Sequence, residues 1–148
     1  MDIERYKIEK NVNSVYFEFI SKGNHGSIVK LVKYDLIYDV PLVFNLGFGD
    51  MNDKGEVDFS AISNNGDTEK VLSTVAYTLV DFFDVYPSAI VYFVGLTKNR
   101  TRLYQMGISK FICLIPKEFS IYGELDGVAQ RFKKGVNYNS FIIRKSLK

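Results

Sequence analysis

The sequence predicts an α+β fold in which a mainly antiparallel sheet carries two helices packed on one face, in the order β-β-β-(β)-α-β-α-β-β. Three extended segments come before the first helical segment, and helices and strands alternate only after it, a pattern typical of α+β proteins. The chain has 148 residues, enough for a hydrophobic core, and we expect a single domain over residues 1–148. Its 12 phenylalanines and 10 tyrosines, without a tryptophan, also favour a sheet-rich core.

The antiparallel part of this prediction depends on the first 59 residues. Two β-rich segments flank a Gly-Asn-His-Gly turn at residues 23–26, whose glycines and asparagine tolerate the positive φ of hairpin turns. The second segment alternates between two faces, and Pro41 separates it from the next. The strands predicted here cover residues 14–22, 27–38, 42–49 and, as a short addition, 57–59.

Two amphipathic segments predict the helices. The first begins at Asp67, whose carboxylate we expect to cap the first-turn amides, and it stops before Pro87. Its apolar side repeats every three or four residues and consists of Leu72, Val75, Ala76, Leu79, Phe82, Phe83 and Tyr86. The second helix is predicted from Lys98 to about Ile115, before Pro116. Further strands are predicted at residues 90–96, 119–125 and 138–144. The first of these is apolar throughout, so we expect it to be covered on both faces.

Charge is divided unevenly along the chain. Residues 1–96 carry 8 basic and 14 acidic side chains, net −6, whereas residues 97–148 carry 11 and 3, net +8. The N-terminal segment is too charged for a signal peptide, and the longest mainly apolar run, residues 88–96, is too short to span a bilayer. The single cysteine excludes an internal disulfide and fits a reducing compartment. We therefore expect a cytoplasmic protein without membrane contact.

The start of the second helix is the strongest candidate for a ligand site. Thr97, Lys98, Arg100 and Arg102 fall within its first turns, directly after an apolar strand. Backbone N–H groups at a helix start lack intrahelical partners and carry partial positive charge, so this junction favours an anion.

The two arginines are expected to behave differently. Arg102 lies on the polar side of the helix, whereas Arg100 lies one turn before Tyr104, on the inward side. Two interpretations of Arg100 stay open. It forms a structural bridge to an acidic residue such as Asp50 or Asp67, or it contacts a phosphate, a nucleic acid or a carboxylate ligand.

The sequence favours binding over catalysis. One histidine and one cysteine supply no metal site or nucleophilic pair, and we predict neither a metal nor a cofactor. The expected partner is a nucleic acid or another phosphate-bearing ligand, with an acidic protein surface as the alternative. The predicted contact surface combines the helix start with the basic side chains Arg131, Lys133, Lys134, Arg144 and Lys145.

An enzyme alternative depends on the segment Arg102-Leu-Tyr-Gln-Met-Gly-Ile108, which is similar to a late helix of acetyl-CoA-dependent acyltransferases. That resemblance implies an acyl transfer in which Tyr104 acts as the acid and protonates the leaving thiolate. The glycine-rich pyrophosphate loop of those enzymes is missing, because Asn64-Asn-Gly-Asp67 precedes the first helix and its aspartate would repel a phosphate.

Five blocks in a fixed order carry a second resemblance: Asn45-Leu-Gly-Phe-Gly-Asp50, Asn65-Gly-Asp67, Lys70-Val-Leu-Ser-Thr-Val-Ala76, Phe93-Val-Gly-Leu-Thr97 and Arg100-Thr-Arg-Leu-Tyr104. Over residues 14–125 the chain resembles an uncharacterised family of small bacterial proteins, a domain of unknown function. The resemblance implies a single cytoplasmic α+β domain with no assigned activity. It singles out Asp50, Asp67, Arg100, Arg102 and Tyr104 for inspection.

Overall fold

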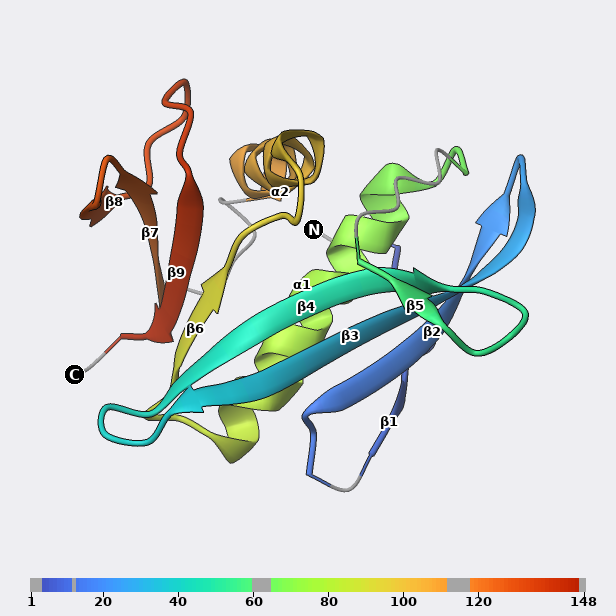
Figure 1. Cartoon of the computed structure of the whole chain (residues 1–148), viewed down its shortest axis with the longest axis horizontal. Coiled ribbons are helices and arrows are strands. Elements are labelled where there is room, and N and C mark those ends of the chain that lie inside the picture. The colour runs from blue at the N-terminus through green and yellow to red at the C-terminus, as the bar shows by residue number, and fades with distance from the viewer. Residues whose placement is uncertain (1–3, 12, 60–64, 112–117, 147–148) are drawn as a thin grey trace.

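The structure is a computed structural model that describes residues 4–11, 13–59, 65–111 and 118–146. In these residues one nine-stranded sheet carries two α-helices on one face, so the predicted α+β class is confirmed (Figure 1). The helices are α1 (Thr68–Val85) and α2 (Lys98–Phe111). The strands are β1 (Glu9–Lys10), β2 (Tyr16–Gly23), β3 (Gly26–Tyr38), β4 (Val43–Met51), β5 (Val57–Asp58), β6 (Ile90–Phe93), β7 (Phe119–Leu125), β8 (Val128–Arg131) and β9 (Ser140–Lys145).

The sheet consists of two parts, β1 to β5 and β6 to β9, which meet where β4 pairs with β6. The strand order runs β1-β2-β3-β4-β6-β9-β7-β8, and β5 pairs with β4 off this path. Every described pair is antiparallel except β4 with β6, which are parallel over only three residue pairs, Val43–Ile90, Phe44–Val91 and Asn45–Tyr92. The acidic first 96 residues thus supply β1 to β6, and the basic remainder supplies β7 to β9 at the other side of the sheet (Figure 1).

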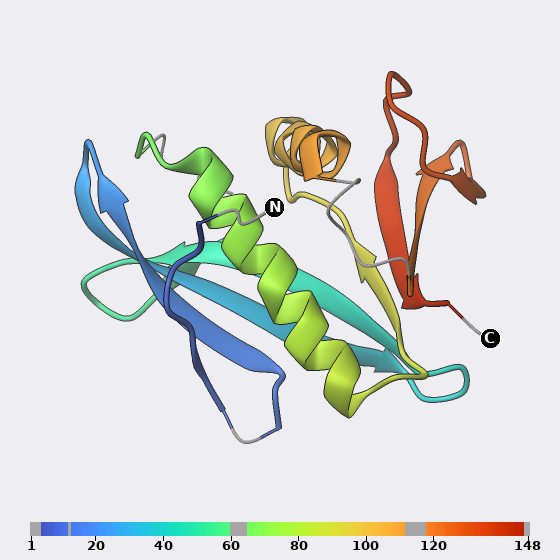
Figure 2. The same cartoon turned by 180° about the vertical axis from the view of Figure 1, so that it is seen from behind.

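Phe82 of α1 is the centre of the core between the helices and the sheet. Its ring is fully buried, stacks on Tyr34 with centroids 4.2 Å apart, and meets Phe44 edge-on at 4.9 Å. The Tyr34 hydroxyl shares a hydrogen bond with Thr78 on the same helix at 2.8 Å, which satisfies both buried polar groups. α1 crosses the sheet obliquely on this face, as the rear view shows (Figure 2).

The predicted apolar side of α1 needs a correction in its details. Val75, Phe82 and Phe83 are buried as expected, but Val71, Thr74 and Thr78 share the buried face. Leu72, Ala76 and Leu79 lie at its margin and line a small apolar space of about 80 Å³ beside α2. Small hydroxyl side chains fill the buried face because their Oγ1 atoms find partners, such as the Lys70 carbonyl for Thr74.

Two local predictions were wrong. Asp67 precedes the first turn of α1, but its carboxylate forms no capping bond and instead accepts hydrogen bonds from the Tyr6 and Ser21 hydroxyls. Strand β6 is not covered on both faces, because Val91 and Phe93 are buried while Ile90 and Tyr92 are partly exposed. Both helices pack on the side of Val91 and Phe93, which leaves the other side of β6 open.

Strand β8 is the main element that the sequence did not predict. The turn before it contains Asp126 and Gly127, both with positive φ (52° and 82°), and Leu125 pairs directly with Val128. An Asp-Gly pair at the tip of a two-residue hairpin is a strong local signal for this geometry. The short strand β1 was also not predicted, and the last four residues of the predicted second helix, 112–115, lie outside the described residues.

The end of the β3–β4 hairpin is apolar and exposed. Leu36, Ile37, Tyr38 and Val40 are 51–83% exposed, and the β3–β4 register shifts between Leu36 and Tyr38. A contiguous exposed apolar group of this kind is typical of a protein contact surface. Asp35 precedes this group and Asp39 lies within it, and both are exposed.

The position of Phe82 gives a stability prediction. Phe82→Ala should lower the free energy of unfolding by about 3–5 kcal/mol, because it removes the ring on which Tyr34 and Phe44 pack. Leu79→Ala, at the margin of the core, should cost clearly less. Urea unfolding of both variants measures this. Equal losses would mean that Phe82 is not the centre of the core.

Candidate functional site

The junction between β6 and α2 is a tight turn held by two threonines. The Thr97 hydroxyl oxygen accepts a hydrogen bond from the Arg100 amide at 3.2 Å, so Thr97 caps the helix. The Thr101 hydroxyl oxygen accepts a bond from the Gly95 amide at 2.9 Å. A Cβ on Gly95 would lie 2.2 Å from the Thr101 nitrogen, so the close approach of strand end and helix requires glycine here.

Arg100 points into the protein, as its place on the inward side of α2 predicts. The side chain is 1% exposed, its guanidinium donates a hydrogen bond to the Phe48 carbonyl at 2.7 Å, and its Cζ lies 4.6 Å from the centre of the Phe48 ring. Arg100 therefore links the first turn of α2 to strand β4. These contacts favour the structural interpretation over direct contact with a ligand.

The two acidic residues proposed as partners for Arg100 have other described contacts. Asp50 accepts a hydrogen bond from Lys30 at 2.6 Å, and both of these side chains are largely buried. Asp67 binds Tyr6 and Ser21, as described above. Asp50, Asp67 and Arg100, which the family resemblance singled out, thus take part in internal contacts that stabilise the fold.

Tyr104 is also part of the core. It is 7% exposed and meets Phe93 edge-on at 5.6 Å. Burial raises the pKa of its hydroxyl, and the positive charge of Arg100 partly opposes this rise. The hydroxyl is thus neutral at physiological pH and lies away from bulk solvent.

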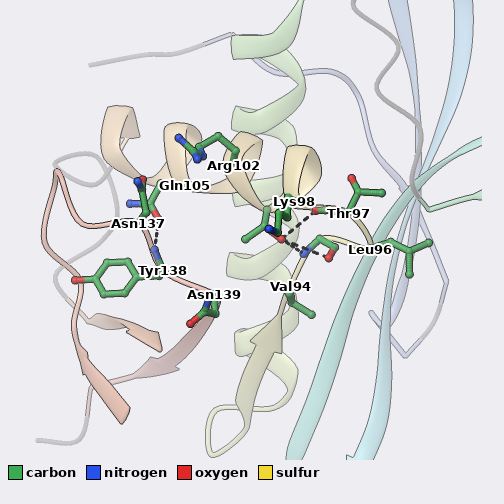
Figure 3. A pocket seen from close by; sticks show the side chains of 11 residues that line it. Val94, Leu96, Thr97, Lys98, Arg102, Gln105, Asn137, Tyr138 and Asn139 are labelled. Carbon is green, nitrogen blue, oxygen red and sulfur yellow. Dashed lines mark hydrogen bonds between the residues drawn. The ribbon is translucent and has the colours of Figure 1, made fainter. Parts of the chain in front are cut away.

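A hollow of about 380 Å³ lies between the start of α2 and the loop before β9 (Figure 3). Its polar lining includes Thr97, Lys98, Arg102, Gln105, Asn137 and Asn139. Gln105 joins the two walls, because its side chain donates to the Val136 carbonyl at 2.6 Å and accepts from the Tyr138 amide at 3.2 Å. The cations Lys98 and Arg102 are both exposed at this hollow.

The remaining predicted basic residues lie elsewhere. Arg131 on β8 is directly opposite Tyr122 on β7, and Arg144 on β9 is directly opposite Ser120. Their neighbours Ile121 and Ile143 face the core, so Arg131 and Arg144 lie on the face of the sheet opposite to the helices. Lys133 and Lys134 are exposed in the loop after β8. The structure therefore separates the α2 start from Arg131 and Arg144, which the sequence had grouped in one surface.

Tyr122 is the residue that sequence reasoning missed. The guanidinium carbons of Arg131 and Arg144 each lie 5.6 Å from the centre of its ring, and Arg144 also approaches its hydroxyl at 3.5 Å. Hydrogen bonds from Arg131 and then Arg144 lower the pKa of Tyr122. The alternation of residues 119–125 would have placed Tyr122 on the face away from the core. Its contact with Arg131, however, depends on strand β8, which was not predicted.

Several basic side chains of the acidic half have carboxylate partners. Lys10, Lys33 and Lys70 each lie within 4 Å of a carboxylate, at 3.6, 3.3 and 3.8 Å. Within residues 4–11, 13–59, 65–111 and 118–146, no carboxylate lies that close to Arg131 or Arg144. The same holds for Lys98, Arg102, Lys133 and Lys134. The positive charge of these six side chains is therefore available to an external anion, whereas Lys110 in the same half pairs with Glu69.

These features define an α+β sheet protein with both helices on one face and unneutralised arginines on the other. The chain belongs to a family of unknown function (DUF6934), which matches residues 2–146. The resemblance found in the sequence is thus confirmed. No significant match was found among curated proteins or among solved structures. Neither of the two described helices is long and apolar enough to cross a membrane.

Arg100→Ala and Arg102→Ala compare a buried arginine with an exposed one, and only the first should lower the free energy of unfolding substantially. Loss of Arg100 removes a charged hydrogen bond and leaves the Phe48 carbonyl in a cavity, so it should cost about 2–4 kcal/mol. Arg102→Ala should stay within about 0.5 kcal/mol of wild type. Chemical denaturation of both variants tests this, and similar losses would contradict the assigned helix faces.

Gly95→Ala tests the tight turn before α2. The added Cβ meets backbone atoms of Arg100 and Thr101, which cannot rotate away as a side chain could. We expect a loss of roughly 2 kcal/mol or more, typical of overpacking. Gly127→Ala is not a suitable control, because its positive φ adds strain. Gly47→Ala is the matched control, because its added Cβ would make only ordinary contacts, 3.4 Å or more, with the side chains of Phe59 and Lys33.

Proposed function

We propose that this protein is a non-catalytic binding module for a phosphate-bearing partner, with nucleic acid as the first candidate. We further propose that residues 1–148 act as one cytoplasmic domain. The single observation that supports binding is the arrangement of Arg131 and Arg144, exposed on the open face of the sheet on either side of Tyr122.

The chemistry of these groups suits a phosphate. Guanidinium groups offer several N–H donors in a planar fork that matches phosphate oxygens. With Arg131 on β8 and Arg144 on β9, the two guanidinium groups approach Tyr122 from different strands of the sheet. An anion placed between them would relieve their mutual repulsion, and the Tyr122 hydroxyl would add a further donor.

The acyl-transfer alternative is less well supported. Its proposed acid, Tyr104, packs against Phe93 in the core and is 7% exposed. The described hollow at the α2 start is lined by Thr97, Lys98 and Arg102, and Tyr104 is not among its lining residues. A substrate seated in that hollow would thus not reach the Tyr104 hydroxyl.

A salt titration tests the proposal. Binding of a short fluorescent single-stranded oligonucleotide, followed by anisotropy, should weaken steeply between about 50 and 200 mM salt through counterion release. The double variant Arg131→Ala/Arg144→Ala should bind more weakly and reduce the salt slope by about 1–2, since each phosphate contact contributes roughly 0.7–0.9. Lys7→Ala/Lys54→Ala, an exposed pair in the acidic half, is the control with the same change in charge.

Two outcomes would contradict the proposal. If both double variants lose affinity equally, net charge rather than Arg131 and Arg144 governs binding. If wild type binds no nucleic acid at low salt, the nucleic-acid function is removed. The alternative of a protein partner would then lead, with the exposed apolar end of the β3–β4 hairpin as its best described surface.

A further inference from the structure

One straight row of side chains crosses the open face of the sheet. Strand register places Asn45 beside Tyr92, Tyr92 beside Ile142, Ile142 beside Tyr122 and Tyr122 beside Arg131. Directly paired residues point to the same face, and the neighbours Phe44, Val91, Phe141 and Ile121 are buried on the other face. The row thus runs from β4 to the edge strand β8 on the side that the helices leave uncovered.

The row contains two aromatic side chains with an apolar one between them, and a cationic side chain at one end. Tyr92, Ile142 and Tyr122 are all partly exposed. Neighbouring strands lie about 4.8 Å apart, so the two tyrosines are about 10 Å apart with Ile142 between them. Arg131 lies at the end of the row. Arg144 lies beside the row on β9, two residues after Ile142 and on the same face of the sheet.

Charge sets the limits of this surface. Beyond Asn45 the next residue of the row is Asp35 on β3, which is exposed and pairs with Lys33 at 3.3 Å. Glu124, two residues after Tyr122, is occupied by hydrogen bonds to the Ser140 hydroxyl and the Gly127 amide. A polyanion would therefore be confined to the part of the face from β4 to β8.

We propose that single-stranded nucleic acid lies across this row, with unpaired bases stacked on Tyr122 and Tyr92 and backbone phosphates held by Arg131 and Arg144. This inference depends on the function proposed above and specifies its ligand. Aromatic side chains contribute to single-strand binding because every base offers a π-face, and they add no comparable contact to bases already stacked in a duplex. The apolar Ile142 between the rings provides a floor that a base or sugar can cover.

The experiment compares ligands with and without accessible bases. Fluorescence anisotropy would follow a labelled oligothymidylate, an oligouridylate, a duplex of the same length, and competition by linear polyphosphate. Tyr122→Ala should weaken binding of both single strands by roughly 5- to 150-fold, the range for loss of one stacked base. Tyr122→Phe should retain most of the affinity, because the ring remains. The Kd for polyphosphate, derived from the competition, should change much less than the Kd for the single strands in both variants, since polyphosphate has no bases and loses only the contact with the Tyr122 hydroxyl.

Two further variants keep the test independent of folding. Tyr92→Leu preserves an apolar side chain on the central strand β6 but removes the aromatic face, and it should weaken single-strand binding in the same range. Tyr38→Ala, an exposed tyrosine at the β3–β4 hairpin end, should leave binding unchanged. The melting temperature of each variant establishes that it is folded at the temperature of the titration.

The outcomes separate this inference from the function on which it depends. If Tyr122→Ala and Tyr92→Leu bind single strands as wild type does, while Arg131→Ala/Arg144→Ala binds weakly, phosphate binding stands and base stacking is overturned. Equal affinity for the duplex and the single strands would overturn it as well. If no nucleic acid and no polyphosphate binds, both proposals fail.

Discussion

The buried guanidinium of Arg100 fixes helix α2 against strand β4, and the other contacts of α2 depend on this position. Its hydrogen bond to the Phe48 carbonyl and its position over the Phe48 ring link the first turn of α2 to strand β4. Since α2 also binds the loop before β9 through Gln105, this contact adds to the pairing of β6 with β9 in placing the C-terminal strands. A buried charge costs free energy unless its donors are satisfied, so a contact of this kind tolerates little displacement.

Strand alternation alone determines which side chains face the core and which lie on the open face of the sheet. Ile121 and Ile143 pack into the core, so Tyr122 and Arg144 must point the other way. Both helices cover the core face (Figures 1 and 2), so the polar and aromatic side chains of the opposite face stay accessible. The proposed ligand surface thus needs no loop of special conformation. It requires only the strand order β4-β6-β9-β7-β8.

The sequence predicted what depends on local periodicity and missed what depends on distant partners. The 3.6-residue period separated Arg100 from Arg102 correctly, and the aromatic and apolar patterns gave both helices and most strands. The hydrogen bonds of Asp67 were missed because Tyr6 and Ser21 are far away in sequence. The row from Asn45 to Arg131 depends on the order β4-β6-β9-β7-β8, which no local pattern specifies. Strand β8 was within reach, since Asp126-Gly127 is a recognisable hairpin turn.

The separation of acidic and basic segments across the sheet gives the molecule a large permanent electric dipole, directed along the strand order. In the field of a polyanion such a molecule rotates before contact, so that β8 approaches first and the acidic strands trail. The same dipole makes molecules attract one another end to end when ionic strength is low. At about 0.1 M salt the screening length is about 10 Å, shorter than the molecule, and this mutual attraction fades. Solubility should therefore rise with added salt, the salting-in behaviour of strongly dipolar proteins.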